Sequence, residues 1–274
     1  MLLRIMSWNV LHGAHREGRW PRLAEIIRAN EPSIVLLQEC RGWLERDMSQ
    51  VIAAENDLGM RVWVGFSASG GHTVLAHRRD LPVMAFESNP YTLLHGYGAG
   101  RFAIPGLPVP LVVISAHLTP YSVDAAAAEV RTLVARAYRY DGLGVIGGDL
   151  NSCPVGDPEP PWAEVQPYNR MIRCLPRETP DEPWRANTIV GRTLTDGQMI
   201  DVAAHLADLR GDVSLRAATG RGRVRVDRFH VTAALRDAVV DYWRVDPDGA
   251  SDHWGIVTVL DTDRVDLSQV RAYT

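Results

Sequence analysis

The sequence is organised around short apolar runs that each end on a polar side chain. Residues 33–37 lead to Glu39. Residues 143–146 lead through two glycines to Asp149. An unbroken apolar run of this length is typical of a strand buried on both faces. We therefore expect buried strands within an α/β fold.

The segments between these runs complete an alternating pattern of helices and strands. Apolar residues at helical spacing predict helices over residues 20–29, 43–55, 123–139 and 198–207. Strands are predicted over residues 2–9, 33–37, 61–66, 72–77, 82–87, 111–115, 143–146, 223–231, 239–245 and 255–260. Ser122 is suited to cap the third helix, whereas the proline-rich segment 152–192 has no assignment. No linker divides the chain, so we expect a single α/β domain over residues 1–274.

The overall composition argues against several classes of protein. The formal net charge is −4, so no global basic field attracts nucleic acid. Three cysteines are too few for a disulfide framework, and no stretch approaches the roughly 20 apolar residues that a membrane span needs. The N-terminus lacks the apolar core and cleavage site of a secretory signal. We therefore expect a cytoplasmic protein with no membrane span and no obligate protein partner.

Acids, amides and histidines gather near the ends of the predicted strands, which is where sites form in open α/β sheets. Residues two apart in an extended segment point to the same side, so Asp149 and Asn151 present a carboxylate and an amide together. Their oxygens suit Mg²⁺ or Mn²⁺ rather than Zn²⁺, and histidines can transfer protons beside them. Such a set fits hydrolysis of a phosphate ester. Its members are Asn9, Glu39, His117, Asp149, Asn151, Asp227, Asp252 and His253.

Six motifs around these residues occur in the order typical of one superfamily. They are SWNV at 7–10, LLQE at 36–39, SAHL at 115–118, GGDLN at 147–151, RVDRF at 225–229 and SDHW at 251–254. With them the chain resembles the endonuclease/exonuclease/phosphatase superfamily, the DNase I-like fold, over nearly its whole length. The resemblance implies a four-layered α/β sandwich. Two mixed β-sheets pack face to face in it, helices lie outside, and the site lies at one edge.

The resemblance also implies a metal-binding side of the site. Glu39 resembles the principal ligand of the metal ion, which would be Mg²⁺ or Mn²⁺. Asn9 lies beside it, as a further ligand or as a residue that holds the surroundings of the nucleophile. Asp252 occupies the place of another metal-side carboxylate.

The other five residues resemble catalytic groups of the family. Asp149 is similar to the aspartate that orients or deprotonates the attacking water, and Asn151 to the residue that binds the substrate phosphate. His253 resembles the histidine that contacts the phosphoryl oxygen or activates water, with Asp227 fixing its tautomer. His117 resembles the general acid for the leaving oxygen. Abasic-site repair nucleases typically carry tyrosine at the position of His117, so the chain looks less like one of them.

Two further features allow more than one interpretation. In the run GRGRVRVDR, alternation along a strand would place Arg221, Arg223 and Arg225 on one face. That face is either a phosphate-binding strip or a solvated edge strand. Trp162 and Trp184 can stack on a base or pack within their own loop.

The leading interpretation is a divalent-metal-dependent phosphoester hydrolase, most of all a phosphodiesterase or nuclease in which an activated water attacks in line. Its partner would be nucleic acid or another phosphoester. The alternative is a phosphatase or phosphodiesterase that acts on a small-molecule or lipid phosphate, because the net charge does not separate the two. A catalytically silent binding module is a third interpretation. It predicts decay of the motifs, whereas every key position is filled.

Overall fold

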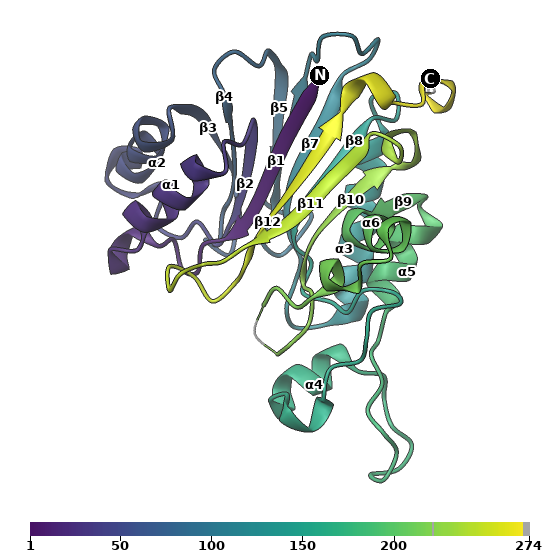
Figure 1. Ribbon diagram of the computed structural model, residues 1–274. Coiled ribbons are helices and arrows are strands. Elements are labelled where there is room, and N and C mark those ends of the chain that lie inside the picture. Colours follow the sequence, from purple (N-terminus) through teal and green to yellow (C-terminus); the bar gives the residue numbers. More distant parts are fainter. Residues whose placement is uncertain (221, 271–274) are drawn as a thin grey trace.

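Two mixed β-sheets packed face to face form the centre of the protein in Figure 1, a computed structural model that describes residues 1–220 and 222–270. The first sheet contains, in spatial order, β11 (Val239–Val245), β12 (Gly255–Asp261), β1 (Leu2–Asn9), β2 (Ile34–Gln38), β4 (Thr73–Arg78) and β3 (Met60–Gly65). The second contains β5 (Val83–Asn89), β6 (Tyr97–Phe102), β7 (Leu111–His117), β8 (Gly144–Asp149), β10 (Asp227–Thr232) and β9 (Met199–Asp201). The pairs β1–β2 and β7–β8 are parallel, and the other pairs are antiparallel.

Four of the six α-helices in the described part of the chain cover the outer faces of the two sheets. The helices are α1 (Trp20–Ala29), α2 (Glu45–Leu58), α3 (Val123–Tyr138), α4 (Pro167–Arg173), α5 (Ile189–Asp196) and α6 (Val202–Arg210). Side chains of α1 and α2 pack on the first sheet, and those of α3 and α5 on the second. No helix in the described part of the chain is long and apolar enough to cross a membrane. The predicted four-layered α/β sandwich is confirmed.

Strand β2 shows why the apolar runs are unbroken. Ile34 and Leu36 face the core between the sheets, whereas Val35 and Leu37 face the opposite way into the core beneath α1 and α2. All four side chains are fully buried. Both faces of this strand therefore require apolar residues, as the sequence pattern predicts.

Two β–α–β units place the strand ends that carry the candidate site. Helix α1 connects the parallel strands β1 and β2, and α3 connects β7 and β8. Ser122 caps α3, as predicted, by accepting from the N–H of Ala125. The carboxyl ends of both parallel pairs lie at the same end of the sandwich (Figure 1). The antiparallel strands β10 and β12 begin at that end, so six chain segments meet there.

Strand β6 was not predicted from the sequence. Its segment, YGAGRF, contains two glycines, and glycine is unfavourable in a strand. Here the glycines permit close packing of the sheets. A Cβ on Gly98 would lie 2.9 Å from the ring of Phe86, and a Cβ on Gly65 would lie 2.6 Å from the Gly98 nitrogen.

Other element boundaries also differ from those predicted. The predicted helix 198–207 begins as the short strand β9, and Asp201 then caps α6 by accepting from the N–H of Ala204. The predicted strand 223–231 begins only at Asp227. Helix α2 begins at Glu45 rather than at residue 43. The unassigned segment 152–192 contains α4 and the start of α5.

Candidate active site

Gly148 brings the end of β8 against β7. Its φ is +155°, and a Cβ there would lie 1.8 Å from the carbonyl oxygen of Ala116. This close approach pairs Asp149 with His117 across the two parallel strands. Asn151 follows in a left-handed conformation, and its backbone N–H donates to Asp149 Oδ1 at 2.9 Å. The GGDLN motif therefore fixes the position of a carboxylate at the strand end.

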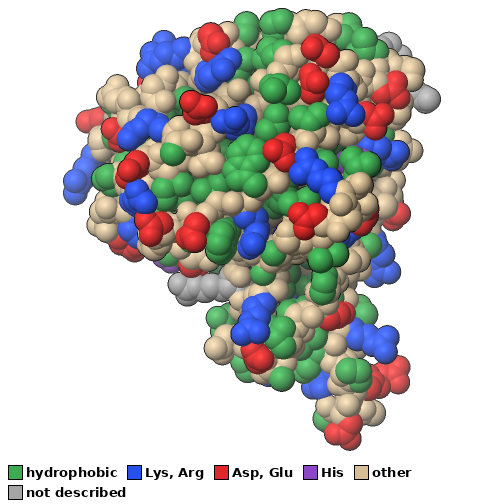
Figure 2. Space-filling model, in the orientation of Figure 1, with side chains coloured by type: hydrophobic (Ala, Val, Ile, Leu, Met, Phe, Trp, Pro, Cys, Tyr) green, Lys and Arg blue, Asp and Glu red, His purple; other side chains and the backbone are tan. Residues whose placement is uncertain are grey.

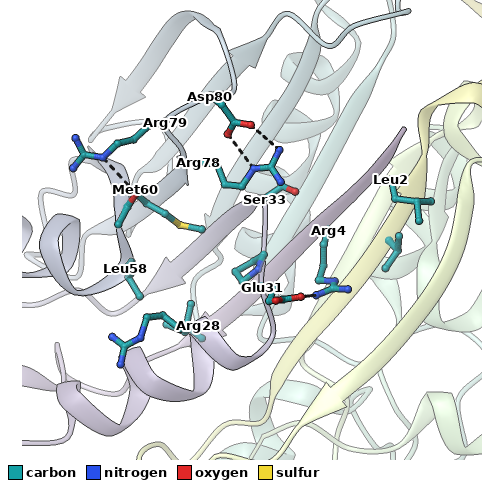
Figure 3. Close-up of a pocket in the computed structure, with 14 residues that line it drawn as sticks. Leu2, Arg4, Arg28, Glu31, Ser33, Leu58, Met60, Arg78, Arg79 and Asp80 are labelled. Atoms are coloured by element: carbon teal, nitrogen blue, oxygen red, sulfur yellow. Dashed lines mark hydrogen bonds and ion pairs between the residues drawn. The ribbon is translucent and has the colours of Figure 1, made fainter.

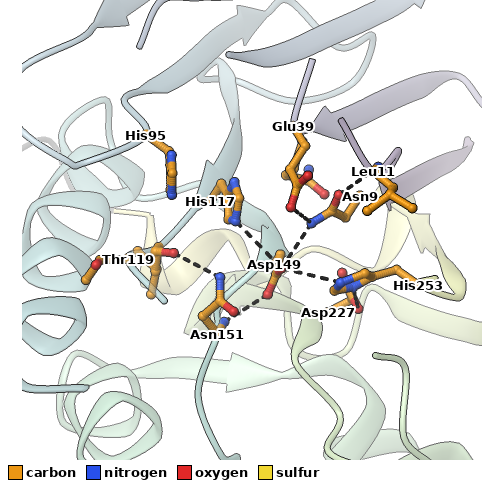
Figure 4. Close-up of polar contacts among 12 residues, drawn as sticks. Asn9, Leu11, Glu39, His95, His117, Thr119, Asp149, Asn151, Asp227 and His253 are labelled. Carbon is orange, nitrogen blue, oxygen red and sulfur yellow. Dashed lines mark hydrogen bonds and ion pairs between the residues drawn. The ribbon is translucent and has the colours of Figure 1, made fainter. Parts of the chain in front are cut away.

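Asp149 is the centre of the polar cluster in Figure 4. Its buried Oδ2 accepts a hydrogen bond of 3.1 Å from Asn9 Nδ2. The same oxygen lies 3.7 Å from His117 Nε2 and 3.9 Å from His253 Nε2. Burial alone would raise the pKa of Asp149, but His253, His117 and the hydrogen bonds hold that pKa below its ordinary value. Asp149 is therefore a carboxylate that can accept a proton.

Asn9 joins Asp149 to Glu39. Its Nδ2 also donates to Glu39 Oε1 at 3.1 Å, and its Oδ1 accepts from the N–H of Leu11 at 3.0 Å. Glu39 Oε2 accepts from the N–H of His12 at 3.0 Å. Burial alone would raise the pKa of Glu39, but these donors and the nearby His117 lower it. Two carboxylates thus face one amide group at the edge of the sandwich.

Asp227 and His253 form a hydrogen-bonded pair beside Asp149. His253 Nδ1 lies 2.8 Å from Asp227 Oδ2, so the predicted partners are in direct contact. Burial alone would lower the pKa of His253, but Asp227, Asp149 and Asp252 raise it to about 10. His253 therefore carries a positive charge at neutral pH and faces Asp149 with Nε2.

The structure brings the predicted residues together at one place. Contacts that span up to 140 residues of sequence join Asn9, Glu39, His117, Asp149, Asn151, Asp227 and His253. Asp252 is half-buried next to His253 in the chain. Ligand atoms of Asp149, Asp227 and His253 lie within 4.8 Å of one another, a spacing that could hold a metal ion. That trio differs from the predicted ligands, which are Asn9, Glu39 and Asp252.

Two further histidines lie at the site, of which His95 was not predicted from the sequence and His12 was expected only in a surface loop near it. His95 stacks on His117 with ring centroids 4.2 Å apart. His12 Nδ1 lies 3.3 Å from Glu39 Oε2. Neither residue belongs to a recognisable motif. Only the position of His12, just after the strand that ends at Asn9, signals that it could lie near the site.

The arginine run does not form the predicted one-sided strip. Arg225 and Arg228 are buried, and Arg225 is held in ion pairs inside the fold. Arg223 is exposed and pairs with Glu164 at 2.9 Å. Arg221 lies outside the described residues. For Arg225 both interpretations, a phosphate-binding strip and a solvated edge strand, are wrong, because the carboxylates of Asp157 and Asp201 neutralise its charge inside the fold.

Residues 152–188, called the arm below, stand out from the end of the sandwich at which β8 ends (Figure 1). Figure 2 shows that basic and acidic side chains are intermixed on the arm. Trp162 is buried within it and donates to Glu159. Arg177 lies 3.8 Å from the ring centroid of Trp184. Both tryptophans therefore have packing partners in the arm, which favours the packing interpretation over base stacking.

A pocket of about 900 Å³ lies far from this cluster, at the amino ends of β1 and β2. Figure 3 shows that two of its arginines have internal partners. Arg78 forms an ion pair with Asp80 at 3.0 Å, and Arg4 one with Glu31 at 3.6 Å. None of the eight predicted site residues lines this pocket. The polar cluster, and not this cavity, is the candidate active site.

Comparison with known proteins gives one family match. The model of the Endonuclease/Exonuclease/phosphatase family matches residues 6–253. That range includes all eight predicted site residues. No curated protein sequence matches the chain.

Solved structures resemble the chain in fold. Truncated TDP2 of Caenorhabditis elegans is 18% identical, with 95% of this chain and 97% of that chain covered and a TM-score of 0.58. D. rerio TDP2, complexed with single strand DNA product, is 16% identical, with 95% and 99% covered and a TM-score of 0.63. The endonuclease domain of TRAS1, a telomere-specific non-LTR retrotransposon, is 16% identical, with 95% and 98% covered and a TM-score of 0.59.

Proposed function

The chain belongs to the endonuclease/exonuclease/phosphatase family, and from that premise we propose that it is a divalent-metal-dependent hydrolase of phosphodiesters. One observation carries this proposal. The buried carboxylate of Asp149 lies between two histidines, 3.7 Å from His117 Nε2 and 3.9 Å from His253 Nε2. A base with a proton donor on either side suits a reaction that makes one P–O bond and breaks another.

Each of the catalytic side chains has a role that its contacts support. Asp149 orients a water molecule and accepts its proton as the water attacks phosphorus. The charged His253, held by Asp227, stabilises the negative charge on the phosphoryl oxygens. Asn151, whose Nδ2 donates to the carbonyl oxygen of Leu118 at 3.0 Å, is the proposed ligand of the substrate phosphate through its second amide hydrogen. His117 donates a proton to the leaving oxygen.

The donor set at this edge fits Mg²⁺ or Mn²⁺. Glu39 and Asp149 bring two carboxylates to one amide group. Asp227 Oδ1 is buried and has no hydrogen-bond partner among the described residues. Hard oxygen donors of this kind suit such ions, and Glu39 and Asp252 are the proposed ligands. A bound divalent ion would neutralise phosphoryl charge and favour ionisation of the attacking water.

Asn9 has a different proposed role from that of a metal ligand. Its nitrogen, and not its oxygen, faces Glu39 and Asp149, and its oxygen accepts a hydrogen bond from the N–H of Leu11. An amide binds a metal ion through its oxygen. We therefore propose that Asn9 holds the two carboxylates in place, which is the second of the two roles that the resemblance leaves open.

Metal dependence gives the first prediction. EDTA should abolish hydrolysis, and added Mg²⁺ or Mn²⁺ should restore it. Glu39→Gln should weaken the binding of Mn²⁺ at least about tenfold, because the variant loses one anionic ligand. Calorimetric titration with Mn²⁺ measures the affinity. Glu25→Gln is the matched control, because Glu25 is exposed on α1 and forms an ion pair with a surface arginine, Arg22. Full activity in EDTA, or unchanged Mn²⁺ affinity in Glu39→Gln, would contradict the proposal.

The shape around the site favours a polymer as the substrate. The arm projects from the end of the sandwich that carries the site, and it extends away from the body (Figures 1 and 2). An arm that extends outwards leaves room for a chain that continues past the reacting phosphate. The D. rerio TDP2 structure contains a single strand DNA product, which supports nucleic acid as the first substrate to test.

Salt dependence separates a nucleic acid from a small phosphoester. If the enzyme contacts three phosphates of DNA, raising salt from about 50 to 200 mM should weaken binding by about 20- to 40-fold through loss of counterion release. Cleavage of single-stranded and supercoiled DNA at low substrate concentration measures this. Hydrolysis of bis-p-nitrophenyl phosphate in the same buffers is the control and should change little. Turnover of small esters alone, with both DNAs intact, would favour the alternative of a small-molecule phosphatase or phosphodiesterase.

A further inference from the structure

His117 and His253 flank Asp149, but their rings are held in different ways. His253 Nδ1 is hydrogen-bonded to Asp227, which fixes the orientation of the ring. His117 Nδ1 is buried and has no hydrogen-bond partner among the described residues. A catalytic imidazole needs a fixed orientation, so another contact must supply it for His117.

The ring of His95 makes such a contact. It stacks on His117 with centroids 4.2 Å apart and planes 14° from parallel, and Figure 4 shows the two rings next to each other. His95 is 6% exposed, and its Nδ1 lies 2.8 Å from Ser69 Oγ. Burial and the neighbouring His117 lower the pKa of His95 to about 4, so its ring is neutral at pH 7. A neutral ring can support His117 without repelling its proton.

Helix α3 holds the two loops that carry this pair. Glu129 Oε1 accepts from the N–H of Leu94 at 2.7 Å, and Oε2 accepts from the N–H of Thr119 at 2.7 Å. Leu94 immediately precedes His95, and Thr119 lies two residues after His117. One carboxylate thus fixes the backbone on both sides of the stack.

We propose that His95 is a positioning residue for the leaving-group half of the reaction, holding His117 by ring stacking so that its Nε2 faces the scissile bond. This inference rests on the proposed function, in which His117 is the general acid. In that reaction the water oxygen bonds to phosphorus and its proton passes to Asp149. The P–O bond to the leaving group breaks, its electron pair stays on the leaving oxygen, and the Nε2 proton of His117 neutralises that oxygen.

A pair of aryl diesters tests the inference, because general-acid catalysis matters most for a poor leaving group. The p-nitrophenyl and phenyl diesters of thymidine 5′-phosphate differ only in the leaving phenol. His95→Gln, which removes the ring, should lower kcat on the phenyl ester about tenfold and on the p-nitrophenyl ester no more than about twofold. KM should not change. His95→Phe keeps a flat ring and should restore most of the activity on the phenyl ester.

Two reference variants make every outcome decisive. His117→Ala should lose activity selectively on the phenyl ester, and equal losses on both esters would refute the proposed role of His117 itself. If that selectivity is present, equal losses or no loss in His95→Gln would overturn the inference about His95. That inference also fails if His95→Phe behaves like His95→Gln. His205→Ala, on α6, is the matched histidine control, and thermal unfolding establishes that each variant is folded.

Discussion

Asp149→Asn is expected to lower kcat/KM on a phosphodiester by about 10²- to 10⁴-fold, the range that a positioned general base contributes. Asparagine has nearly the same size and shape, so the change removes the charge and basicity of the carboxylate but not its volume. Its amide oxygen can still accept from the N–H of Asn151, a bond of 2.9 Å in the structure. What is lost is the group that lies between His117 and His253 and takes the proton of the attacking water.

Stability should fall as well. His253, His117 and the hydrogen bonds hold the pKa of Asp149 below its ordinary value, so the carboxylate stabilises the folded state at neutral pH, and the melting temperature of Asp149→Asn should be lower than that of the wild type. Asp124→Asn, on the exposed first turn of α3, is the matched control and should keep wild-type activity. Steady-state kinetics on bis-p-nitrophenyl phosphate and a thermal melt measure both quantities. Activity within about fivefold of wild type would assign Asp149 a structural role instead.

The positions of the candidate site residues could be predicted because they follow from local sequence. Glu39, His117 and Asp149 each lie at or just after the end of an apolar run, and the carboxyl ends of parallel strands share one edge of a sheet. The helix at 20–29 and the Ser122 cap are local in the same sense. Where propensity, pattern and capping agree, the sequence alone determines the element.

The features that were missed depend on contacts between distant segments. His95 lies at the site because Glu129 accepts hydrogen bonds both from its loop, at Leu94, and from the residues after β7, at Thr119. Leu94 and Glu129 are 35 residues apart in the sequence. Strand β6 forms because the opposite sheet needs small residues at Gly98, although glycine is a poor strand former. Arg225 leaves the predicted strand because two carboxylates pair with it. None of these contacts leaves a periodic signal in the sequence.

Arg225→Met is expected to lower the free energy of unfolding by about 3–5 kcal/mol, the usual cost of removing one partner from a buried ion pair. The side chain of Arg225 is fully buried and forms hydrogen bonds of 2.8 to 3.0 Å with both carboxylate oxygens of Asp157 and of Asp201. Methionine is similar in length, so the main effect is to remove this buried cation from two half-buried carboxylates. Asp157 keeps its ion pair with Arg216. Asp157 lies in the arm and Asp201 ends β9, so the variant should also loosen the base of the arm.

The pH dependence of that loss identifies its cause. Burial alone would raise the pKa of Asp201, but Arg225 holds that pKa below the ordinary value of 3.8. A carboxylate with a depressed pKa contributes stability that is present above pH 3.8 and is lost as the pH falls through its folded-state pKa. The difference in free energy of unfolding between wild type and Arg225→Met, measured by urea denaturation, should therefore be largest near neutral pH and should decrease in acid. Arg223→Met, which removes only an exposed pair with Glu164, should cost less than about 1 kcal/mol. Equal stability of wild type and Arg225→Met at pH 7 would mean that the buried ion pairs do not hold the arm to the sandwich.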